Sequence, residues 1–361
     1  MHIVFVDDSV KFDAFTPSRK ALGGAEKAFA SLPGALARLG HEVTVLNNCL
    51  HPMIAEKAKW RPLKSRPPSS ADILVAYRKP GLLGTLRRAL KRVLWVTGSP
   101  DYLTQLGAER LVESFAPTLM FIGETQAQAY TGNASTVRLT TGIRTDYLEK
   151  PEEIEPFLDM SHDMPTPSAI EGGPPPPHAI VTTHPRHGLE WLLDVWIEKI
   201  HPQLPQARLM VYSASLSQSE KEKDGSEDLQ VILRRVREAA SANVTILKPK
   251  GDRSMAEIYR QARVHLYPGH ERDFACWTLA ESQATGLPAV ARAKGAAEER
   301  IINGQSGFIV PDADAFANVA LEILTKDDVY TNLSQEAVAS KRHLTWQHAA
   351  RDFESHFISV S

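Results

Sequence analysis

Short runs of apolar, often β-branched residues recur along the 361-residue chain and are separated by more polar stretches. Runs of this length, bounded by turn residues, are typical of buried strands. In the first half of the chain they predict strands at Ile3–Val6, Val43–Leu46, Ile73–Ala76, Val93–Val96, Leu119–Ile122 and Val137–Thr140. In the second half they predict strands at Ala179–Val181, Leu209–Tyr212, Val244–Leu247, Val264–Tyr267, Ala289–Ala291 and Phe308–Val310.

Apolar residues at helical spacing lie between these strands. Between the first two strands the repeat is Ala25, Phe29, Leu32, Leu36 and Leu39, and Pro33-Gly34 predicts a kink in that helix. In the second half the helical stretches are Leu189–Ile200, Asp228–Ala240, Ala256–Ala262, Thr278–Thr285 and Ala315–Leu324. Strands that alternate with helices in this way predict an α/β protein with two Rossmann-like domains, each a doubly wound parallel sheet.

The chain is too long for one core of ordinary size, so we expect two domains, at residues 1–150 and 179–341. Residues 151–178 are rich in proline, which continues neither a helix nor a central strand, and they predict an interdomain linker with a surface loop. Residues 342–361 predict a C-terminal helix that packs back on the first domain. Ligands of such sheets bind beyond the carboxyl ends of the strands, so two facing domains predict a substrate cleft between them.

The formal net charge of −2 hides a difference between the two halves. Residues 1–150 contain 20 Lys and Arg against 13 Asp and Glu, whereas the remaining residues contain 21 against 30. This asymmetry indicates that the halves face different partners. The chain has no apolar run long enough for a membrane-spanning helix, and its N-terminus reads as a strand and not as a signal peptide. Because Cys49 and Cys276 are the only cysteines, we expect a cytoplasmic protein.

Two segments contain candidate chemistry. Gly23-Gly24 precedes the first amphipathic helix, where glycines let the backbone approach an anion and the helix start favours negative charge. A plain strand-to-helix turn explains this pair equally well. Asp273 and Glu281 lie about two helical turns apart in a segment that runs from a strand end into a helix. Carboxylates there can accept hydrogen bonds from sugar and ribose hydroxyls, and solvated or capping acids are the alternative.

The segment from Asp273 to Val290 resembles the signature of glycosyltransferase family 4. Members of that family have the GT-B fold and pair two acids eight positions apart before a Gly-x-Pro-Val strand. Further on, Gly295–Val310 resembles the family's glycine-rich, glutamate-containing stretch. Thr141–Arg144 resembles its Asn-Gly-Ile-Asp turn, and Gly23–Glu26 resembles its donor-facing glycine loop. The resemblance covers essentially the whole chain, in the right order.

This resemblance implies a retaining glycosyltransferase with a nucleotide-sugar donor, such as a UDP- or GDP-sugar. Glu281 would bind the donor ribose hydroxyls, and Asp273 would hold hydroxyls of the transferred sugar. Other donor-side residues would be the backbone amides of Phe274, Ala275 and Cys276 near the sugar or diphosphate, and Gly23 and Gly24 facing the phosphates. The family needs no cofactor, and the sequence contains no Asp-x-Asp metal site in a plausible context.

The chain departs from the family pattern at several of these positions. Asp273 replaces the usual Glu, and Cys276 stands where the family often has Gly. The usual Arg and Lys that clamp the diphosphate are absent from the segment after the second domain's first strand. Arg186 is our candidate for the clamp, assisted by His184 or His187, although both histidines could equally be capping or loop residues. Lys250 is a possible second phosphate contact, with a solvated surface lysine as the alternative.

On the acceptor side, many relatives have a histidine where this chain has Leu94–Asp101. No histidine is there, so Thr97, Ser99 or Asp101 would serve instead, unless they only cap the strand. The first domain also contains clustered basic residues with one tryptophan. These residues are Lys57, Lys59, Trp60, Arg61, Lys64, Arg66, Arg87, Arg88, Lys91 and Arg92. They suggest an anionic acceptor or peripheral contact with the inner face of an anionic membrane, but solvated helix faces explain them as well.

The acceptor itself stays open, with a sugar, a glycan or a lipid-linked glycan as candidates. Nucleic acid is not expected as a partner, because aromatic residues are sparse among the basic ones. Two other functions fit the same architecture. The chain could be an inactive relative that binds nucleotide sugars, given its altered clamp and missing acceptor-side histidine, or a nucleotide-sugar 2-epimerase. A nicotinamide enzyme is disfavoured because no Gly-x-Gly-x-x-Gly follows the first strand.

Overall fold

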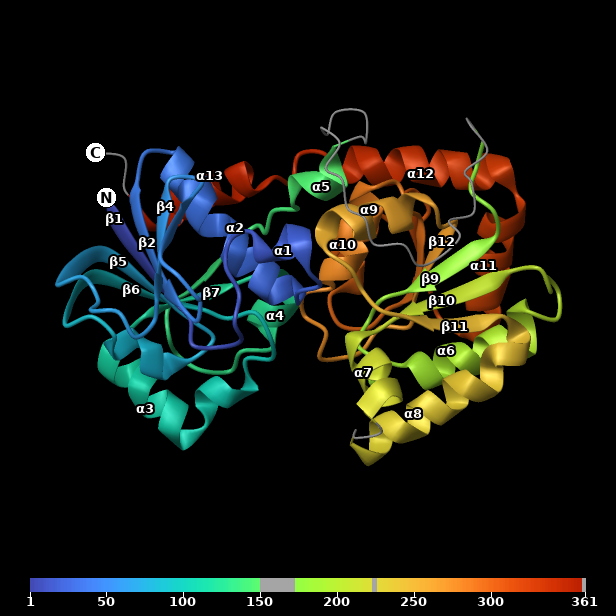
Figure 1. The fold of residues 1–361 in the computed structure, drawn as a ribbon, viewed down its shortest axis with the longest axis horizontal. Helices are drawn as coiled ribbons and strands as arrows, with labels where there is room; N and C mark the ends of the chain where they lie inside the picture. Colours follow the sequence, from blue (N-terminus) through green and yellow to red (C-terminus); the bar gives the residue numbers. More distant parts are fainter. Residues whose placement is uncertain (150–172, 223–225, 359–361) are drawn as a thin grey trace. The chain divides into compact units, whose positions relative to one another are not determined.

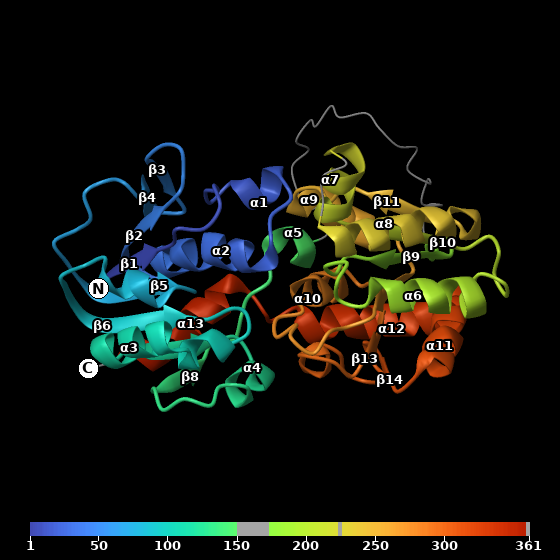
Figure 2. The same ribbon diagram turned by 90° about the horizontal axis from the view of Figure 1, so that it is seen from below.

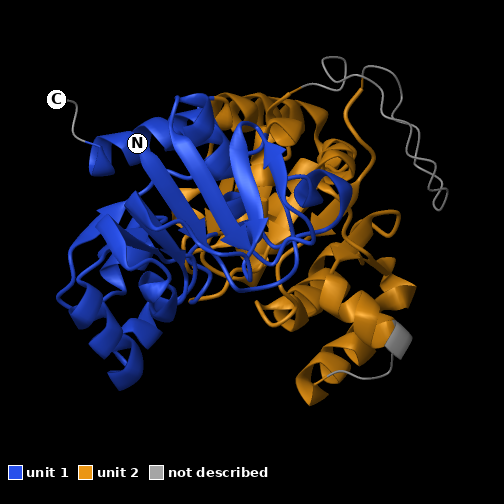
Figure 3. Cartoon of the chain, turned by 60° about the vertical axis from the view of Figure 1, so that its left-hand side comes forward, with its two compact units in different colours: residues 1–144, 272–275, 343–361 blue, residues 145–271, 276–342 orange. Residues whose placement is uncertain are grey.

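The computed structural model describes residues 1–149, 173–222 and 226–358 and divides the chain into two compact units (Figures 1 and 3). Unit 1 comprises Met1–Arg144, Arg272–Ala275 and His343–Ser361, and unit 2 comprises Thr145–Glu271 and Cys276–Arg342. The divisions at 144 and 342 lie within a few residues of the predicted boundaries. Most of the predicted linker lies outside the described residues, and its last residue, His178, already begins a strand.

Unit 1 contains an eight-stranded sheet in the described residues, with the order β3-β4-β2-β1-β5-β6-β7-β8. The strands are β1 (His2–Val6), β2 (Glu42–Asn47), β3 (Met53–Ala55), β4 (Ala58–Pro62), β5 (Ser70–Tyr77), β6 (Arg88–Trp95), β7 (Thr118–Phe121) and β8 (Thr136–Arg138). All neighbours pair in parallel except β3 and β4. The six predicted strands are present, whereas β3 and β4 were not predicted, because the edge strand β3 has only three residues and charged residues interrupt the apolar pattern of β4.

Helices connect these strands and cover the sheet (Figure 2). They are α1 (Thr16–Arg19), α2 (Gly24–Arg38), η1 (Pro80–Gly84), η2 (Asp101–Thr104), α3 (Leu106–Phe115), α4 (Glu124–Gln128) and α13 (Trp346–Phe357). Helix α2 is continuous across Pro33, where the sequence predicts a kink. The run from Ala25 to Ala37 in this helix is buried almost throughout, so tertiary packing offsets the hydrogen bond that proline removes.

The C-terminal helix α13 packs on α2 and belongs to the core of unit 1. Phe5 on β1 contacts Phe29 of α2, with ring centroids 5.9 Å apart, and Phe353 of α13, with centroids 6.5 Å apart. The Thr345 hydroxyl accepts a hydrogen bond from the His348 amide at 3.1 Å and caps the helix. Aromatic pairs of this kind contribute about 0.5–1.5 kcal/mol each beyond their buried area.

Unit 2 contains a six-stranded, entirely parallel sheet with the order β11-β10-β9-β12-β13-β14. Its strands are β9 (His178–Val181), β10 (Arg208–Tyr212), β11 (Val244–Leu247), β12 (Val264–Tyr267), β13 (Ala289–Arg292) and β14 (Gly307–Val310). Its helices are α5 (Thr145–Leu148), α6 (Leu189–Val195), η4 (Trp196–Ile200), α7 (Ala214–Glu222), α8 (Glu227–Glu238), η5 (Ala239–Ala242), α9 (Asp252–Arg260), α10 (Trp277–Ala284), η6 (Ala297–Glu299), α11 (Ala313–Thr325) and α12 (Asp327–Lys341). The prediction of an α/β protein with two parallel sheets is confirmed.

The strand order fixes where each sheet places its loops. In unit 2 the chain proceeds outward from β9 in one direction and from β12 in the other, so the order reverses between these two neighbours. In unit 1 the corresponding reversal lies between β1 and β5. Open α/β sheets bind ligands beyond the carboxyl ends of the strands at such a reversal. The loops after β9 and β12, and those after β1 and β5, are therefore the places to search for a site.

Candidate functional site

In unit 2 the loops on either side of the strand reversal contain most of the predicted donor residues. The loop after β9 contains His184, Arg186 and His187, and the segment after β12 runs from Pro268 through Cys276 into α10. Figure 1 shows α9 and α10 on one side of this sheet and α6 and α8 on the other. Each of these residues follows a strand of the unit 2 sheet at its carboxyl end or lies on a helix that begins there, although Arg272–Ala275 groups with unit 1.

Glu281 lies in the middle of α10, and only 8% of its surface is exposed. Two buried tyrosines are close to it, Tyr147 of α5 and Tyr259 of α9, with ring centroids 6.0 Å apart. Burial first, and then the charge of Glu281, raises the pKa of both tyrosine hydroxyls well above the usual value. The Tyr147 hydroxyl donates to Asp252 Oδ1 at 2.8 Å, where Asp252 begins α9. Glu281 is therefore a nearly buried acid in a fixed, polar surrounding.

A buried histidine connects the two loops beneath the site. His265 on β12 is fully buried; its Nε2 lies 3.1 Å from Thr182 Oγ1 and its Nδ1 lies 2.8 Å from Ser282 Oγ. Thr182 directly follows β9, and Ser282 is the neighbour of Glu281 on α10. Burial lowers the pKa of His265 to about 3, so the ring is uncharged at neutral pH. A neutral imidazole with two hydrogen-bonding partners positions α10 against the loop after β9.

Arg186 is engaged with another side chain. Its Nη2 donates to Asp228 Oδ1 at 3.1 Å and to Ser226 Oγ at 2.7 Å, and its Nε donates to Asp228 Oδ2. Hydrogen bonding to Arg186 lowers the pKa of Asp228 far below the usual range. Both side chains are about half exposed, so the pair is a surface ion pair that a competing anion can open. In the structure Arg186, the predicted diphosphate clamp, binds the carboxylate of Asp228 at the start of α8.

Histidines occupy the neighbouring positions of this loop. His187 stacks on His270, with ring centroids 4.6 Å apart and ring planes 14° apart, and His184 lies 5.5 Å from His187. Burial, followed by the nearby His187 and Arg186, lowers the pKa of His184. Arg292 at the end of β13 donates to the Gly269 carbonyl at 3.3 Å and lies 4.1 Å above the Trp191 ring. Nitrogen donors therefore dominate this edge of the sheet, as an anion-binding edge requires.

Cys276 has an unusual backbone conformation at the start of α10. Its φ is +45°, the left-handed region that favours glycine, and its side chain is buried. Phe274 and Ala275, just before it, are buried as well, so their side chains are part of the packed interior. Strained residues of this kind occur preferentially at functional sites. A glycine, as the family often has, would adopt this φ without strain.

Lys250 lies apart from the other donor candidates. It is exposed and follows β11, the edge strand of the unit 2 sheet, immediately before α9. Strand β10 separates β11 from β9, which places these strand ends about 10 Å apart. A contact of Lys250 with a phosphate held by the loop after β9 stays a prediction.

In unit 1 the glycine pair begins α2, but a carboxylate already lies at that helix start. A methyl group on Gly23 would collide with Glu26 Oε2, so the Glu26 side chain folds back over the N-cap. Glu26 Oε1 accepts from Arg78 Nη1 at 2.6 Å, and Arg78 Nε donates to Thr97 Oγ1 at 2.9 Å. The predicted anion position near Gly23 and Gly24 thus has a charged neighbour that the sequence analysis did not consider.

The remaining acceptor-side candidates lie in the loop after β6. Thr97 is buried, Ser99 Oγ accepts from the Asp101 amide at 3.4 Å, and Asp101 begins η2. Asp273 is in the segment Arg272–Ala275, which groups with unit 1, while Glu281 is in unit 2. Arg272 Nη2 lies 3.7 Å from Asp101 Oδ2, and both side chains are exposed. The predicted cleft between the domains stays a prediction.

Several of the basic residues assigned to a binding surface have structural roles. Trp60 is buried, with its ring 6.3 Å from that of Phe29, and Arg92 donates to the backbone carbonyls of Leu83 and Leu86. The inclusion of Trp60 and Arg92 in a surface cluster was therefore wrong. Arg87 and Arg88 are exposed, but they lie at the amino end of β6, opposite the loop that contains Thr97.

Four residues of interest were missed by the sequence analysis: Glu26, Arg78, His265 and His270. Arg78 could have been predicted as a site residue, because it directly follows a buried strand and therefore lies at the carboxyl end of that strand. His265 gave none, because a single histidine within an apolar strand is not distinguishable from an ordinary core residue.

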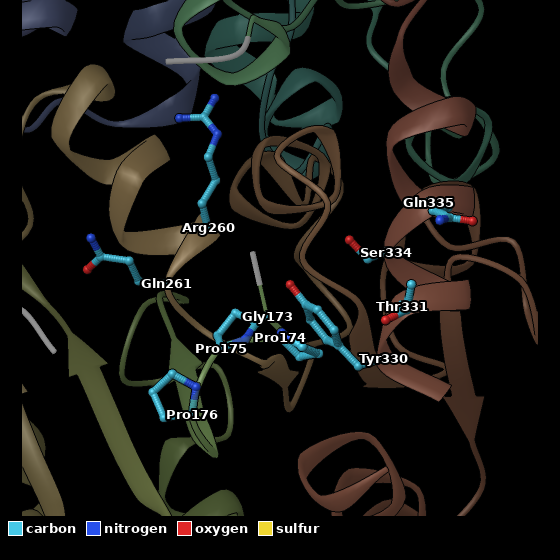
Figure 4. Close-up of a pocket in the computed structure, with 10 residues that line it drawn as sticks. All are labelled: Gly173, Pro174, Pro175, Pro176, Arg260, Gln261, Tyr330, Thr331, Ser334 and Gln335. Atoms are coloured by element: carbon cyan, nitrogen blue, oxygen red, sulfur yellow. The ribbon is translucent and has the colours of Figure 1, made fainter. Parts of the chain in front are cut away.

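The described residues contain no group of metal ligands at the predicted site, and a cavity of unit 2 lies elsewhere. In the described ranges, no three His, Cys, Asp or Glu side chains are grouped to hold a metal ion. A cavity of about 310 Å³ in unit 2 lies before β9, at the amino end of the sheet (Figure 4). Its lining residues are Gly173, Pro174, Pro175, Pro176, Arg260, Gln261, Tyr330, Thr331, Ser334 and Gln335. None of them is a predicted site residue. Over the same described ranges, no helix is both long and apolar enough to cross a membrane.

Comparison with known proteins identifies the second half of the chain. Residues 179–326, which include both loops and α10, match the family described as glycosyl transferases group 1. These residues are similar to a group 1 glycosyl transferase domain. The resemblance noted from the sequence is thereby confirmed.

Curated relatives of this group 1 domain include a D-inositol 3-phosphate glycosyltransferase from Stackebrandtia nassauensis. The two sequences are 32% identical over 111 residues, which is 30% of this chain and 25% of the relative. The chain thus spans about a quarter of the length of the curated relatives it matches.

Solved structures resemble the whole chain at low identity. Sucrose-phosphate synthase from Thermosynechococcus elongatus matches with a TM-score of 0.68 and 14% identity, covering 99% of this chain and 98% of that one. HepE from Anabaena, in complex with UDP and glucose, matches with a TM-score of 0.69 and 15% identity, covering 99% of both chains. These similarities show the fold that the group 1 domain and its N-terminal partner share with GT-B glycosyltransferases.

Proposed function

We propose that this protein is a retaining glycosyltransferase that moves a sugar from a nucleotide-sugar donor to an acceptor hydroxyl. The observation that carries the proposal is the placement of Glu281 and the nitrogen-rich loop after β9 on either side of the strand reversal, inside a group 1 glycosyl transferase domain. A nearly buried carboxylate suits the ribose hydroxyls, and arginine and histidine donors suit a diphosphate. The complex of HepE with UDP and glucose supports UDP-glucose as the first donor to test.

In the proposed reaction the bond between the sugar's anomeric carbon and the diphosphate breaks, and its electron pair goes to the phosphate oxygen. The acceptor oxygen bonds to the same face of that carbon, and its proton passes to the leaving phosphate. The chain's own contribution is electrostatic, because His184, Arg186 and His187 stabilise the charge that grows on the phosphate. Asp273 orients the sugar by accepting hydrogen bonds from its hydroxyls. No metal ion is required in this scheme.

The acceptor belongs to the proposal as well. We expect a sugar, a glycan or a lipid-linked glycan, since transfer needs only an acceptor hydroxyl that can reach the anomeric carbon of the donor sugar. Contact with an anionic membrane is supported by Arg87 and Arg88 beside Leu90, which is 81% exposed. Vesicles of pure phosphatidylcholine and vesicles with added phosphatidylglycerol provide the test, and sedimentation with the anionic vesicles alone is the expected result. Sedimentation with neither vesicle excludes the membrane contact.

Donor binding is the first experiment for the activity. Thermal unfolding with UDP-, GDP-, ADP- and TDP-sugars should show a raised midpoint for one nucleotide class, because a ligand that binds the folded state stabilises it. Transfer to a mixed panel of sugars and glycolipids, with and without EDTA, then tests transfer and metal independence together. NMR of the product's anomeric proton tests retention.

The alternatives predict different results in the same assays. A stabilising donor with neither transfer nor slow donor hydrolysis indicates a nucleotide-sugar-binding relative. An epimerised free sugar that appears without an acceptor indicates the 2-epimerase. If no nucleotide sugar raises the midpoint or is consumed, the proposed function is wrong.

A further inference from the structure

The strand reversal of unit 1 contains a charged cluster that includes Thr97, a predicted acceptor-side residue, and Glu26, the last residue of the predicted glycine loop; its two other members, Asp7 and Arg78, have no role assigned by the sequence or the comparisons. Asp7 directly follows β1, Arg78 directly follows β5, and Thr97 lies just after β6. Glu26 reaches the same place from the first turn of α2. These four residues, here called the Arg78 cluster, occupy the position at which an open α/β sheet binds its ligand.

Arg78 is held rigidly within this cluster. Its φ is +61°, a conformation that costs a side-chain-bearing residue about 1–2 kcal/mol. The Tyr102 hydroxyl donates to its carbonyl, its Nε donates to Thr97 and its Nη1 donates to Glu26. Among the described residues no partner is found for its Nη2, and 35% of the side chain is exposed. Tyr102 thus fixes the backbone of Arg78, and Thr97 and Glu26 fix its guanidinium, which leaves Nη2 available to a ligand or to solvent.

The surrounding charges decide which ligand suits this nitrogen. Glu26 already pairs with Arg78, and its carboxylate is only 13% exposed. Asp7, 1% exposed, accepts from the Ser9 hydroxyl at 2.7 Å and from the Ser9 amide at 3.2 Å. Two acids beside one guanidinium leave no excess positive charge, so a phosphate would meet carboxylate repulsion there. A neutral hydroxyl group can donate to Glu26 and accept from Arg78 without that repulsion.

The exposed Arg87 and Arg88 do not change this balance. Arg88 pairs with Ser70 at the amino end of the sheet, and Trp95 pairs with Tyr77 seven residues further along. Seven residues of extended strand span about 23 Å, beyond the screening length of physiological salt. Arg87 and Arg88 therefore cannot neutralise the two acids of the Arg78 cluster.

We infer that Glu26 and Arg78 bind the acceptor of the reaction and select an uncharged, hydroxyl-bearing group over its phosphorylated form. Glu26 accepts a hydrogen bond from one acceptor hydroxyl, and Arg78 Nη2 donates to a neighbouring acceptor oxygen. This inference rests on the proposed function, because it assigns the second substrate of that reaction. It also contradicts the expectation of an anionic acceptor, which came from the excess of basic residues in residues 1–150.

The test compares binding and transfer for matched neutral and anionic compounds. The panel contains glucose, mannose, galactose, N-acetylglucosamine and myo-inositol, each with its phosphate monoester, and binding is measured by saturation-transfer NMR. The variants are Glu26→Gln and Arg78→Gln. The controls are Arg38→Gln and Glu56→Gln, which remove the ion pair at the opposite end of α2. Glu26→Gln preserves the side-chain shape, so it reports on binding even if Arg78→Gln lowers stability.

The wild-type protein should bind at least one neutral compound, and at least tenfold more tightly than its phosphate. Each variant should weaken that binding about tenfold, the usual effect of losing a hydrogen bond to a charged group, and leave the donor-induced thermal shift unchanged. Both control variants should bind like the wild type.

Preference for a phosphorylated compound, or no binding of any neutral one, overturns the inference. The inference is also overturned if Arg78→Gln weakens donor binding as much as it weakens binding of the neutral compound, because the Arg78 cluster would then bind the donor. Failure of the proposed function has a separate signature, because the wild-type protein would then show no thermal shift with any nucleotide sugar.

Discussion

The carboxyl edges of the two sheets contain different chemistry. In unit 2 the loop after β9 and its neighbours present His184, Arg186, His187 and His270, with an exposed ion pair to Asp228. In unit 1 the strand reversal places the guanidinium of Arg78 beside two acids that are largely buried. Both edges belong to parallel sheets with a strand reversal, so the fold alone does not explain the difference.

This difference indicates a division of labour between the units. Nitrogen donors with an exposed, replaceable counter-ion suit an incoming anion such as a diphosphate, because the anion can take the place of Asp228. Charges that are already paired suit an uncharged, hydroxylated partner. Four predictions test this division of labour between the units.

Asp273→Ala should have the largest effect. If Asp273 holds the transferred sugar as the bond breaks, its loss should lower kcat roughly 100-fold, similar to the loss of one preorganised transition-state contact. The donor Kd should change much less, because the nucleotide contacts remain. Steady-state transfer assays and donor titrations measure the two quantities. The exposed Glu271→Ala, two residues earlier, is the control; equal kcat values for Asp273→Ala and wild type would remove Asp273 from the site.

Glu281→Ala should weaken donor binding about tenfold or more, because it removes a charged acceptor for the ribose hydroxyls. Glu26→Gln, its counterpart in unit 1, should leave donor binding unchanged. Isothermal titration with the nucleoside diphosphate measures both. Exposed Glu238→Ala of α8 controls for the loss of a negative charge in unit 2. Weaker donor binding in both site variants would mean that the two edges are not distinct.

His265 should make the stability of unit 2 sensitive to acid. Its pKa is lowered to about 3 in the folded chain, whereas an unfolded histidine takes up a proton near pH 6.5. As the pH falls below 6.5, only the unfolded state gains this proton, so stability is lost by up to about 1.4 kcal/mol per pH unit. Urea unfolding at several pH values should show this slope reduced in His265→Gln.

The exposed His51→Gln is the control for this slope and should behave like the wild type. If His265→Gln keeps the full wild-type slope, the ring is not buried and neutral as described. A change in donor affinity for His265→Gln at constant pH would in addition support its role in positioning α10.

Asp228→Asn should have the smallest effect and the opposite sign. It removes the carboxylate that pairs with Arg186. If Arg186 serves as the diphosphate clamp, the variant should bind the nucleoside diphosphate a few-fold more tightly, in line with the modest strength of surface ion pairs. Arg186→Gln should cancel that gain in the double variant. Unchanged affinity in Asp228→Asn would mean that Arg186 has only a structural role.

The local pattern of apolar residues was sufficient to predict the architecture of the protein. Continuous apolar runs such as Val264–Tyr267 form strands wherever both faces of a sheet are covered, and helical spacing between them leaves few other folds. The separation of Asp273 from Glu281, the following glycine and proline, and the other motifs together predicted the resemblance to a glycosyltransferase family, and residues 179–326 match the group 1 glycosyl transferases. The short strands β3 and β4 were not predictable in this way, because β3 has only three residues and the apolar residues of β4 alternate with Lys59 and Arg61.

The partners of charged side chains were decided by tertiary structure. The sequence shows Arg186 beside two histidines, but Asp228 is 42 residues away and reaches it only because α8 begins near the loop after β9. Glu26 and Arg78 are 52 residues apart and meet because β1 and β5 are neighbours in the sheet. Composition suggested a positive first domain, yet the sheet places Arg87 and Arg88 at one edge and the balanced Arg78 cluster at the other. Sequence patterns encode local periodicity and motif spacing, whereas charge pairing depends on which strand ends the chain brings together.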